Sequence, residues 1–428
     1  MTPKSLVKWL IISILALVLA GCQGSAPKSE PAADPAAQQP ADQPAAQPAE
    51  KPVEITFWHT YGDTETEVFT NEVLPLWSAS HPNVTVNAVR QDSSQYHQMV
   101  VTSFGTGQSP DVARIDIVNT APYAKQGGLV ALDDLPGFSA NDFLEGPLST
   151  NLYQGKYYGL PLDTNCKAAV VNTAILKDAL GIDSAKFTME EFIAAAESRG
   201  QYSLNVSGVG DWDLYPYFWL FGGVLTDDGF TKASGYLDSD QSVAAINKIQ
   251  ELHDKKIFTI RDIDGSVDAW DGINSEYAMF IEGPWFFGAY EEKANAGIIA
   301  ATVPTYNGKS ASVVGGENIV VFSTSKQQDA AYEFAKFMTT PEVQLAMLKT
   351  GQLPILKSLV SHEDITSNPV WSVYMEQLST GASARIPSPS HTEIGQIWSD
   401  TINNIFVDSK DVKTALSDAA YQIDSLLK

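Results

Sequence analysis

The sequence predicts an α/β fold, and three of its features support that class. Short apolar stretches rich in Val and Ile alternate with longer amphipathic stretches in the first part of the chain, a pattern typical of parallel sheets covered by helices. About 375 residues follow a Pro-rich N-terminal region, which is enough for two domains. With only two cysteines in 428 residues, a packed core rather than a disulfide framework must stabilise the fold.

Strands and helices alternate from residue 53 onward. Thr188 and Glu191 have the spacing of a capping box, and Gly200 marks the end of the helix that they begin. Strands separated by helices predict a parallel sheet covered on both faces. The other expected elements are a strand at Val53–Trp58, a helix over 65–80, a strand at Val84–Ala88, a helix over 94–104 that ends at Gly105, and strands at Asp111–Ile117, Tyr277–Ile281 and Ser312–Val321.

The N-terminal residues have the pattern of an export signal. Lys4 and Lys8 precede an apolar run from Trp9 to Ala20, which is too short to span a membrane and is typical of a signal peptide. The run ends in Leu19-Ala20-Gly21-Cys22, which looks like a bacterial lipobox. We therefore expect a signal peptide over 1–21 and a lipid on its next residue, Cys22. An ordinary cleavage site beside a chance cysteine is the alternative.

Residues 22–52 are expected to form a spacer. After Cys22 they contain no Val, Ile, Leu, Met or aromatic residue and carry a proline every four or five residues. Such a segment cannot bury a core and is expected to be disordered and extended. The mature protein is therefore expected at the extracellular face of the cell membrane, lipid-anchored, with its folded part held away from the bilayer. Cys166 is then left unpaired.

Charge and motifs exclude several classes of function. A formal net charge of −24 opposes nucleic-acid binding, which needs a basic surface. The six histidines are scattered, and Asp262–Asp268 resembles a calcium loop but has Ile273 where the twelfth ligand would stand. The sequence contains no P-loop, nucleophile-elbow or dinucleotide-binding motif. No cofactor and no metal are therefore expected.

Several short stretches together resemble one family, the extracellular solute-binding proteins, family 1, that feed ABC-type sugar importers. Their order and spacing carry the resemblance, which covers the chain from about residue 53 to the end. An anchored form is typical of the Gram-positive members. The matching stretches are Ile55–Gly62, His81–Val86, Phe104–Val112, Tyr158–Pro161, Met279–Trp285, Gly315–Asn318 and Thr350–Pro354.

The resemblance implies a periplasmic-binding-protein-like fold, in which two α/β lobes are joined by crossing segments and the ligand lies in the cleft between them. It implies a monomer that is not an enzyme, and that binds a carbohydrate, an oligosaccharide here, and passes it to the permease subunits of an ABC importer by lobe closure. The crossings are expected near Asp163–Asn165, Asp271–Glu276 and Gly315–Asn318. The N-terminal lobe would then hold 53–164 and 277–315, and the C-terminal lobe 165–276 and 316–428.

A sugar presents flat apolar faces and a ring of hydroxyls, so its site needs aromatic side chains, carboxylates and amides. We expect these beyond the C-terminal ends of the strands. Arg385, in a loop, could donate to hydroxyls or to a uronate, and Gly315 and Gly316 permit close backbone approach. The ligand-binding candidates are Trp58, Tyr61, Asp63, Asp116, Asp163, Asn165, Trp212, Trp270, Glu282, Trp285, Glu317, Asn318 and Arg385.

Other interpretations stay open at this point. Asp116 and Asp163 could cap helices or turns instead of binding a ligand. A surface glycoside hydrolase would also use two carboxylates and aromatic subsites, and a lipoprotein that presents its ligand to a membrane sensor would share the same features. Polyols and glycerol-phosphate-like ligands are further possibilities. The aromatic residues expected in the core instead are Trp77, Phe218, Trp219, Phe221, Trp371 and Trp398.

Overall fold

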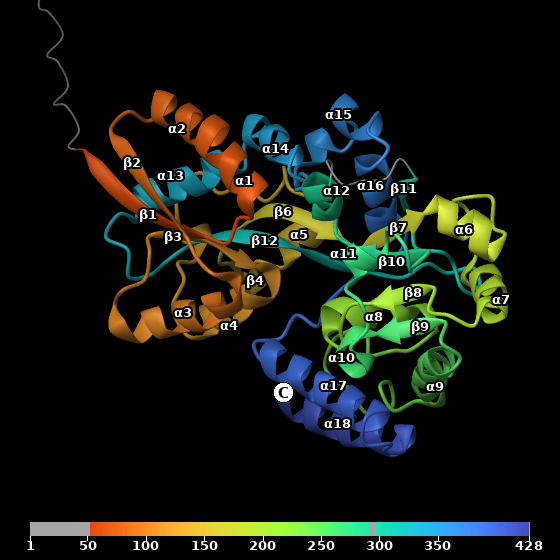
Figure 1. Ribbon diagram of the computed structural model, residues 1–428. Helices are drawn as coiled ribbons and strands as arrows, with labels where there is room; N and C mark the ends of the chain where they lie inside the picture. Colours follow the sequence, from red (N-terminus) through yellow and green to blue (C-terminus); the bar gives the residue numbers. More distant parts are fainter. Residues whose placement is uncertain (1–51, 291–296, 428) are drawn as a thin grey trace, which may run out of the picture. The chain divides into compact units, whose positions relative to one another are not determined.

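The computed structural model describes residues 52–290 and 297–427. The predicted signal peptide over 1–21, the lipidation site Cys22 and all of the spacer except Pro52 lie outside these residues. None of the helices in the described ranges is both long and apolar enough to cross a membrane. The described chain is arranged around two β-sheets, drawn with their helices in Figure 1.

The first sheet has six strands. Five of them are ordered β13-β12-β3-β1-β2, and β6 also pairs with β12. Its strands are β1 (Val53–His59), β2 (Val84–Arg90), β3 (Val112–Asp116), β6 (Leu160–Cys166), β12 (Ser312–Val321) and β13 (Ala382–Ala384). β1 runs parallel to β2 and β3, whereas β12 runs antiparallel to β3 and β6. The sheet is therefore mixed, and only its N-terminal part has the predicted parallel strands.

Helices cover both faces of the first sheet (Figure 1). Ile55 and Phe57 of β1 are fully buried against Phe69 and Trp77 on one face, and Val100 packs on the other face. The first layer consists of α1 (Asp63–Val68), the π-helical turn η1 (Phe69–Val73), α2 (Leu74–Ser80), α13 (Gln328–Met338) and α14 (Pro341–Leu348). The second layer consists of α3 (Ser93–Thr106), the 3₁₀ turn η2 (Ile117–Asn119) and α4 (Thr120–Lys125).

The second sheet has five strands in the order β11-β7-β10-β8-β9. Its strands are β7 (Ala168–Asn172), β8 (Leu204–Val206), β9 (Phe258–Ile260), β10 (Met279–Glu282) and β11 (Ile298–Ala301). Val171 and Ile281 face the larger core, whereas Val170 and Phe280 face a smaller one. Alternate residues of β7 and β10 therefore serve the two faces of this sheet, as the period of a strand requires.

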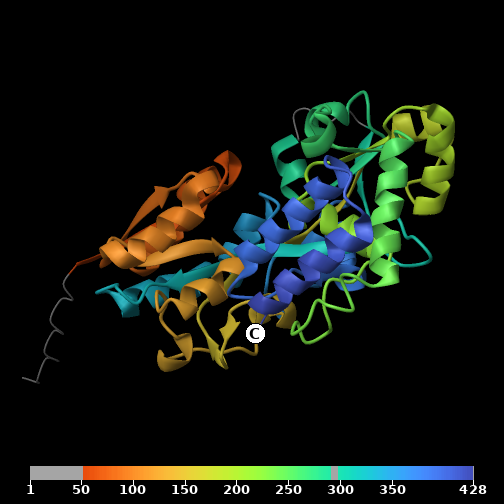
Figure 2. The same ribbon diagram turned by 90° about the horizontal axis from the view of Figure 1, so that it is seen from below.

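Helices also surround the second sheet. Figure 2 shows α17 and α18, the last two helices of the chain, lying side by side. The larger core takes side chains from α6 (Thr173–Leu180), α7 (Met189–Arg199), α8 (Asp211–Leu220), α9 (Asp240–Asp254), α17 (His391–Phe406) and α18 (Val412–Leu426), and the smaller one from α11 (Ala269–Gly272) and α12 (Trp285–Tyr290). The remaining elements are η3 (Leu132–Asp134), α5 (Glu145–Ser149), the hairpin β4 (Leu152–Tyr153) and β5 (Lys156–Tyr157), α10 (Arg261–Asp264), η4 (Lys357–Leu359), α15 (Glu363–Thr366) and α16 (Trp371–Thr380).

The sheet pairing changes the expected division of the chain. β10 was expected within 277–315 of the first lobe, but it pairs with β7 and β8 of the second sheet. Residues 317–321 were expected in the second lobe, but they pair with β3 of the first sheet. The segment Asp271–Glu276 lies between β9 and β10, which share one sheet, so it does not cross between sheets. The other two expected crossings fall within β6 and β12.

Two predicted helices differ in detail from those observed. The helix expected over 65–80 contains the π-helical turn η1, which comes just before Pro75. Because proline cannot donate the usual backbone hydrogen bond, a wider turn before it is a common adjustment. The helix expected to end at Gly105 instead continues to Thr106, and Gly107 ends it with a φ of +68°, a left-handed conformation that favours glycine. The capping box of Thr188 and Glu191 is present as predicted.

Candidate functional site

A buried arginine lies where β3, β6 and β12 run side by side. The Nη2 atom of Arg114 is 2.9 Å from Oε2 of Glu317 and 3.5 Å from Oε1 of Glu65, and its Nε is 3.7 Å from Oδ2 of Asp163. Its Nη1 donates a hydrogen bond of 2.9 Å to Oγ1 of Thr60. One guanidinium therefore serves three carboxyl groups, from α1, β6 and β12.

Burial and charge act in opposite directions on this cluster. Burial raises the pKa of Asp163 and of Glu317, and the positive charge of Arg114 opposes the rise. The backbone N–H of Glu317 also donates to Oδ1 of Asp163 at 3.2 Å. The ring of Tyr61 lies 4.8 Å from the guanidinium carbon of Arg114, and burial raises the pKa of its phenol. These two carboxyls therefore hold a proton more readily than carboxyls in water.

A pair of stacked indoles lies next to β12. The ring centroids of Trp212 and Trp285 are 5.9 Å apart and their planes differ by 25°. Trp212 is in the first turn of α8, and Trp285 begins α12. A Cβ atom on Gly315 of β12 would lie 2.7 Å from the Trp212 ring, so the missing side chain allows the indole to pack on the strand. The two helices of the second sheet thus place aromatic faces beside a strand of the first.

Three buried cations, Arg114, Lys167 and Arg385, lie near these groups, and each is paired. Nζ of Lys167 is 2.5 Å from Oδ1 of Asp213, and Nη2 of Arg385 is 2.9 Å from Oδ1 of Asp116. Lys167 and Arg385 also lie 5.3 and 5.4 Å from the centroid of the Trp212 ring, within the range of cation–π attraction. With Arg114 and Glu317, these pairs link the end of β3 to the first turn of α8 through side-chain contacts.

Trp270 and Glu282 form a further contact on the second sheet. Nε1 of Trp270 donates to Oε2 of Glu282 at 3.1 Å, and Oε1 of the same carboxylate accepts from the N–H of Gly283 at 2.8 Å. Glu282 ends β10 as the sequence predicted. Its two oxygens are both engaged within the protein, so this carboxylate holds Trp270 in place.

The structure brings some of the predicted site residues together and buries others. Those that it brings together are Asp116, Asp163, Trp212, Trp285, Glu317 and Arg385. Asn318 is 0 % exposed, donates to Thr120 at 2.9 Å and accepts from Asn151 at 2.8 Å. Tyr61 is buried among aromatic side chains of the first core. Asn165 lies buried inside β6, opposite Gly315 of β12. All three are therefore packed inside the protein rather than presented on a surface.

Two further candidates lie on the first sheet away from the stacked indoles. Asp63 is exposed at the start of α1 and pairs with Arg90 across 2.6 Å. Trp58 faces α3 and packs against the second core of the first sheet, with Val101 among its neighbours in that cluster. The aromatic residues Trp77 and Trp398 are buried in the core, as predicted.

Sequence reasoning missed Arg114, Lys167, Glu65, Asp211 and Asp213. Two of them had a readable signal. Arg114 stands between the apolar residues Ala113 and Ile115 of β3, and Lys167 separates the buried strands β6 and β7. A basic residue between buried apolar neighbours needs an acidic partner, so both positions indicated an internal ion pair. Glu65, Asp211 and Asp213 had no such signal, because acidic residues near the start of a helix are common.

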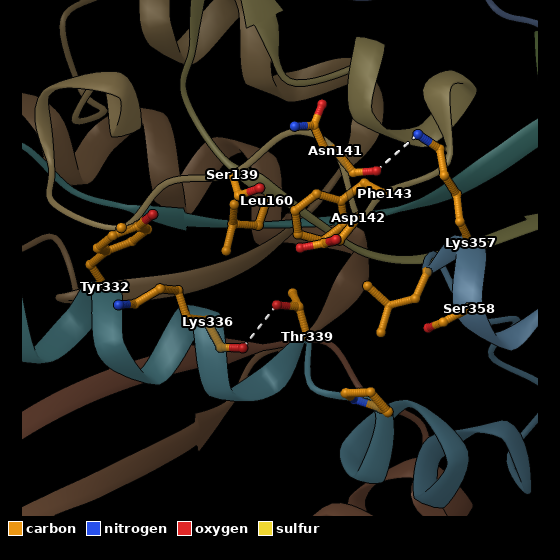
Figure 3. Close-up of a pocket in the computed structure, with 13 residues that line it drawn as sticks. Ser139, Asn141, Asp142, Phe143, Leu160, Tyr332, Lys336, Thr339, Lys357 and Ser358 are labelled. Carbon is orange, nitrogen blue, oxygen red and sulfur yellow. Dashed lines mark hydrogen bonds between the residues drawn. The ribbon is translucent and has the colours of Figure 1, made fainter.

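A separate cavity of about 480 Å³ opens on the first sheet (Figure 3). Its floor is apolar, with Leu160, Phe143 and Tyr332 among its residues, and its rim carries Asp142 and Lys336. It contains none of the predicted site residues. Its mixed lining is suited to a small polar molecule, but the aromatic stacking expected for a sugar site is absent from it.

The described residues contain no cluster of His, Cys, Asp and Glu suited to a metal ion. In the calcium-like stretch Asp262–Asp268, the carboxylate of Asp264 accepts hydrogen bonds from Thr259 and from the backbone N–H groups of Ile260 and Ser266. Its oxygens therefore close a turn of the protein.

Two α/β sheets joined by crossing strands, with aromatic and charged side chains where they meet, define a two-lobed binding protein. The chain belongs to the family of bacterial extracellular solute-binding proteins, whose family model matches residues 77–371. It is 26% identical over 285 residues to the diacetylchitobiose binding protein DasA of Streptomyces coelicolor. The aligned region covers 62% of this chain and 65% of that protein.

Solved structures of similar fold include proteins with different ligands. The GacH receptor of Streptomyces glaucescens, solved unliganded and with acarbose, matches with a TM-score of 0.78 and 23% identity over 88% of this chain and 99% of that one. UgpB of Mycobacterium tuberculosis, solved with glycerophosphocholine, matches with a TM-score of 0.75 and 20% identity over 89% of this chain and 99% of that one. At this level of identity the likeness establishes the fold.

Proposed function

We propose that this protein binds a carbohydrate, an oligosaccharide rather than a single sugar, and delivers it to an ABC importer. The observation that carries the proposal is the stacked pair of Trp212 and Trp285, with carboxylates of both sheets around it. Aromatic faces suit the C–H faces of sugar rings, and carboxylates accept hydrogen bonds from hydroxyls. Two adjacent indoles offer stacking faces to more than one sugar unit.

The related proteins support a sugar ligand but do not identify which sugar this protein binds. One Streptomyces relative, DasA, is a diacetylchitobiose binding protein, and the GacH receptor was solved with acarbose, whereas UgpB was solved with glycerophosphocholine. The aromatic pair favours a carbohydrate ligand. A phosphate ligand is disfavoured, because it needs accessible cations and those of this site are paired with carboxylates. The proposed contact residues are Trp212, Trp270, Trp285, Asp116 and Glu317, with Arg385 and Glu282 in positioning roles.

The proposed mechanism uses the two sheets as the cores of two lobes. The first lobe is built on the six-stranded sheet, which includes β6 and β12, and the second on the five-stranded sheet of β7 to β11. Ligand contacts to both lobes would favour a closed form over an open one. The closed monomer then docks on the permease subunits of the importer. Catalysis has no role in this mechanism.

The proposed location is the outer face of the membrane of a Gram-positive bacterium. The lipobox-like stretch ending in Cys22 supports cleavage after residue 21 and lipidation of that cysteine. A Cys22→Ala variant is then expected to leave the membrane fraction and appear in the medium, whereas the unchanged chain is labelled by radioactive palmitate. Palmitate label on the Cys22→Ala variant would contradict lipidation at this residue.

A ligand screen tests the function directly. The purified protein is heated with maltotriose, cellotriose, diacetylchitobiose and glycerophosphocholine, and its melting temperature is measured. Because a ligand that binds only the folded state stabilises it, a bound oligosaccharide is expected to raise the melting temperature. Each mixture is also analysed for cleavage products. Cleavage of an oligosaccharide without a melting shift would favour a glycoside hydrolase, and a shift with glycerophosphocholine alone would contradict a carbohydrate ligand.

A further inference from the structure

We propose that this site selects saccharides that carry a protonated amine and rejects acidic saccharides. The inference rests on the proposed carbohydrate function and adds the charge of the ligand to it. Its basis is the exposure of the charged groups around the stacked indoles Trp212 and Trp285: the cations are buried, and all but one of the carboxylates are more exposed than the cations.

The exposed fractions of the side chains separate the two kinds of charge. The side chains of Arg114, Arg385 and Lys167 are 5%, 8% and 1% exposed. Asp163 is as buried as the cations, at 5%. The exposed fractions of the other acidic groups near them are larger, at 16% for Glu65, 20% for Glu317, 42% for Asp116, 18% for Asp211 and 24% for Asp213. A ligand that approaches the indoles therefore meets carboxylate oxygens before it meets a cation.

Pairing removes the remaining positive character. Lys167 is held by Asp213 at 2.5 Å, and Arg385 by Asp116 at 2.9 Å. Arg114 is shared by three carboxylates. Asp211 pairs with His391 at 3.0 Å. Asp163 and Glu317 are left out of the charge balance, because burial raises the pKa of both and favours their protonated forms. The four remaining carboxylates, Glu65, Asp116, Asp211 and Asp213, still outnumber the three permanently charged side chains. The surplus charge of this site is negative, and it is only partly screened because the groups are partly buried.

This arrangement of charges disfavours an acidic sugar and favours one that carries an amine. The sequence left open that Arg385 binds a uronate. In the structure, Arg385 is nearly inaccessible, is bonded to Asp116 and lies over the ring of Trp212, so a ligand carboxylate would face Asp116 first. An ammonium group on a sugar would instead be attracted by the surplus carboxylates and by the indole faces. Neutral sugars would bind through hydroxyl donors alone.

Matched ligands test the inference by calorimetry on the full-length protein at pH 7 and low salt. One series is the β-1,4-linked trimers of glucosamine, glucose and glucuronic acid, and the other is maltotriose and its 6-amino-6-deoxy derivative. In a series that binds, we expect the amine to bind at least about tenfold more tightly than the neutral sugar, which is a typical size for one added charge contact. Added salt should reduce that ratio, and the glucuronic acid trimer should not bind.

The outcomes separate this inference from the proposed function. If neutral trimers bind and their amine counterparts bind no more tightly, or if the acidic trimer binds best, the charge selection is overturned and carbohydrate binding stands. If no member of either series binds, the charge selection is overturned, and the melting-temperature screen decides separately whether the protein binds a carbohydrate.

A variant adds a second test. Asp116→Asn keeps the size of the side chain and removes the most accessible carboxylate of the set, so the amine-to-neutral ratio is expected to fall at least about threefold. Asp183→Asn is the matched control, because Asp183 is exposed and pairs with Lys177 on the surface. Its ratio should not change. An equal ratio in both variants, with melting curves that show folded protein, would overturn the role of Asp116.

Discussion

Replacing Arg114 by Met is expected to destabilise the protein strongly. The change keeps much of the side-chain volume but removes the cation that holds Glu317, Glu65 and Asp163 together. Removing one partner of a buried ion pair typically costs about 3–5 kcal/mol. The carboxylates of Glu65 and Glu317 retain some contact with water, so the lower end, about 3 kcal/mol, is expected. Urea unfolding followed by circular dichroism measures this cost.

The pH dependence of that cost gives the prediction a second signature. Burial already raises the pKa of Asp163 and Glu317, and losing Arg114 removes the group that opposes the rise. A carboxyl whose pKa is higher in the folded state binds protons more strongly there, so its folded state gains stability as the pH falls. The deficit of the variant should therefore be smaller at pH 5 than at pH 7.5.

A matched arginine provides the control. Arg90 is 47% exposed and pairs with Asp63, which is 95% exposed, and such surface pairs contribute less than about 1 kcal/mol. Arg90→Met should therefore unfold at nearly the same urea concentration as the unchanged protein. A deficit for Arg114→Met below about 1 kcal/mol, or one that grows at low pH, would refute the reasoning about the buried cluster.

Three further predictions concern other parts of the site. Burial, with smaller effects of nearby arginines, lowers the pKa of His59 to about 4, so between pH 6.5 and 4 only the unfolded chain takes up this proton. The free energy of unfolding therefore falls over that range, and the His59→Gln variant should lose up to roughly 3 kcal/mol less of it than the unchanged protein, as measured by urea unfolding. Asn318→Ala should cost about 2–3 kcal/mol because it breaks a buried amide network, with ligand affinity unchanged in calorimetry. Gly315→Ala should push a methyl group against Trp212 and weaken ligand binding at least about tenfold, whereas Gly395→Ala, in open space within α17, should stabilise by about 0.5–1 kcal/mol.

These outcomes would be contradicted by specific results. An unchanged pH profile for His59→Gln would mean that other groups set the acid response. Loss of ligand affinity in folded Asn318→Ala would return this residue to the contact set. Equal affinities of the two glycine variants would mean that Trp212 can move without cost.

Local patterns predicted the elements of the fold well. The strand Ser312–Val321 was predicted with its observed bounds, and the capping box at Thr188 is formed as expected. These features depend on residues close together in the sequence, such as alternating apolar side chains or a Thr and Glu three residues apart. The N-terminal parallel strands followed from the same local reading.

Long-range pairing was not readable in the same way. β10 was expected in the first lobe, but its apolar residues would suit either sheet, and only its partners β7 and β8 decide the matter. Glu317 and Asn318 both follow a pair of glycines in the sequence, so both were predicted to contact the ligand. Because successive residues of a strand point to opposite faces, one of them reaches Arg114 while the other is buried with Asn151.

The position of β12 has a consequence for when this protein can fold. In the first sheet β12 lies between β13 and β3, yet β3 ends at Asp116 and β12 begins only at Ser312. The centre of the first sheet therefore stays incomplete until most of the chain has been synthesised, and contacts so distant in sequence form slowly. The N-terminal strands alone therefore cannot close into a finished sheet, and a nascent chain keeps the β3 edge unpaired until β12 emerges.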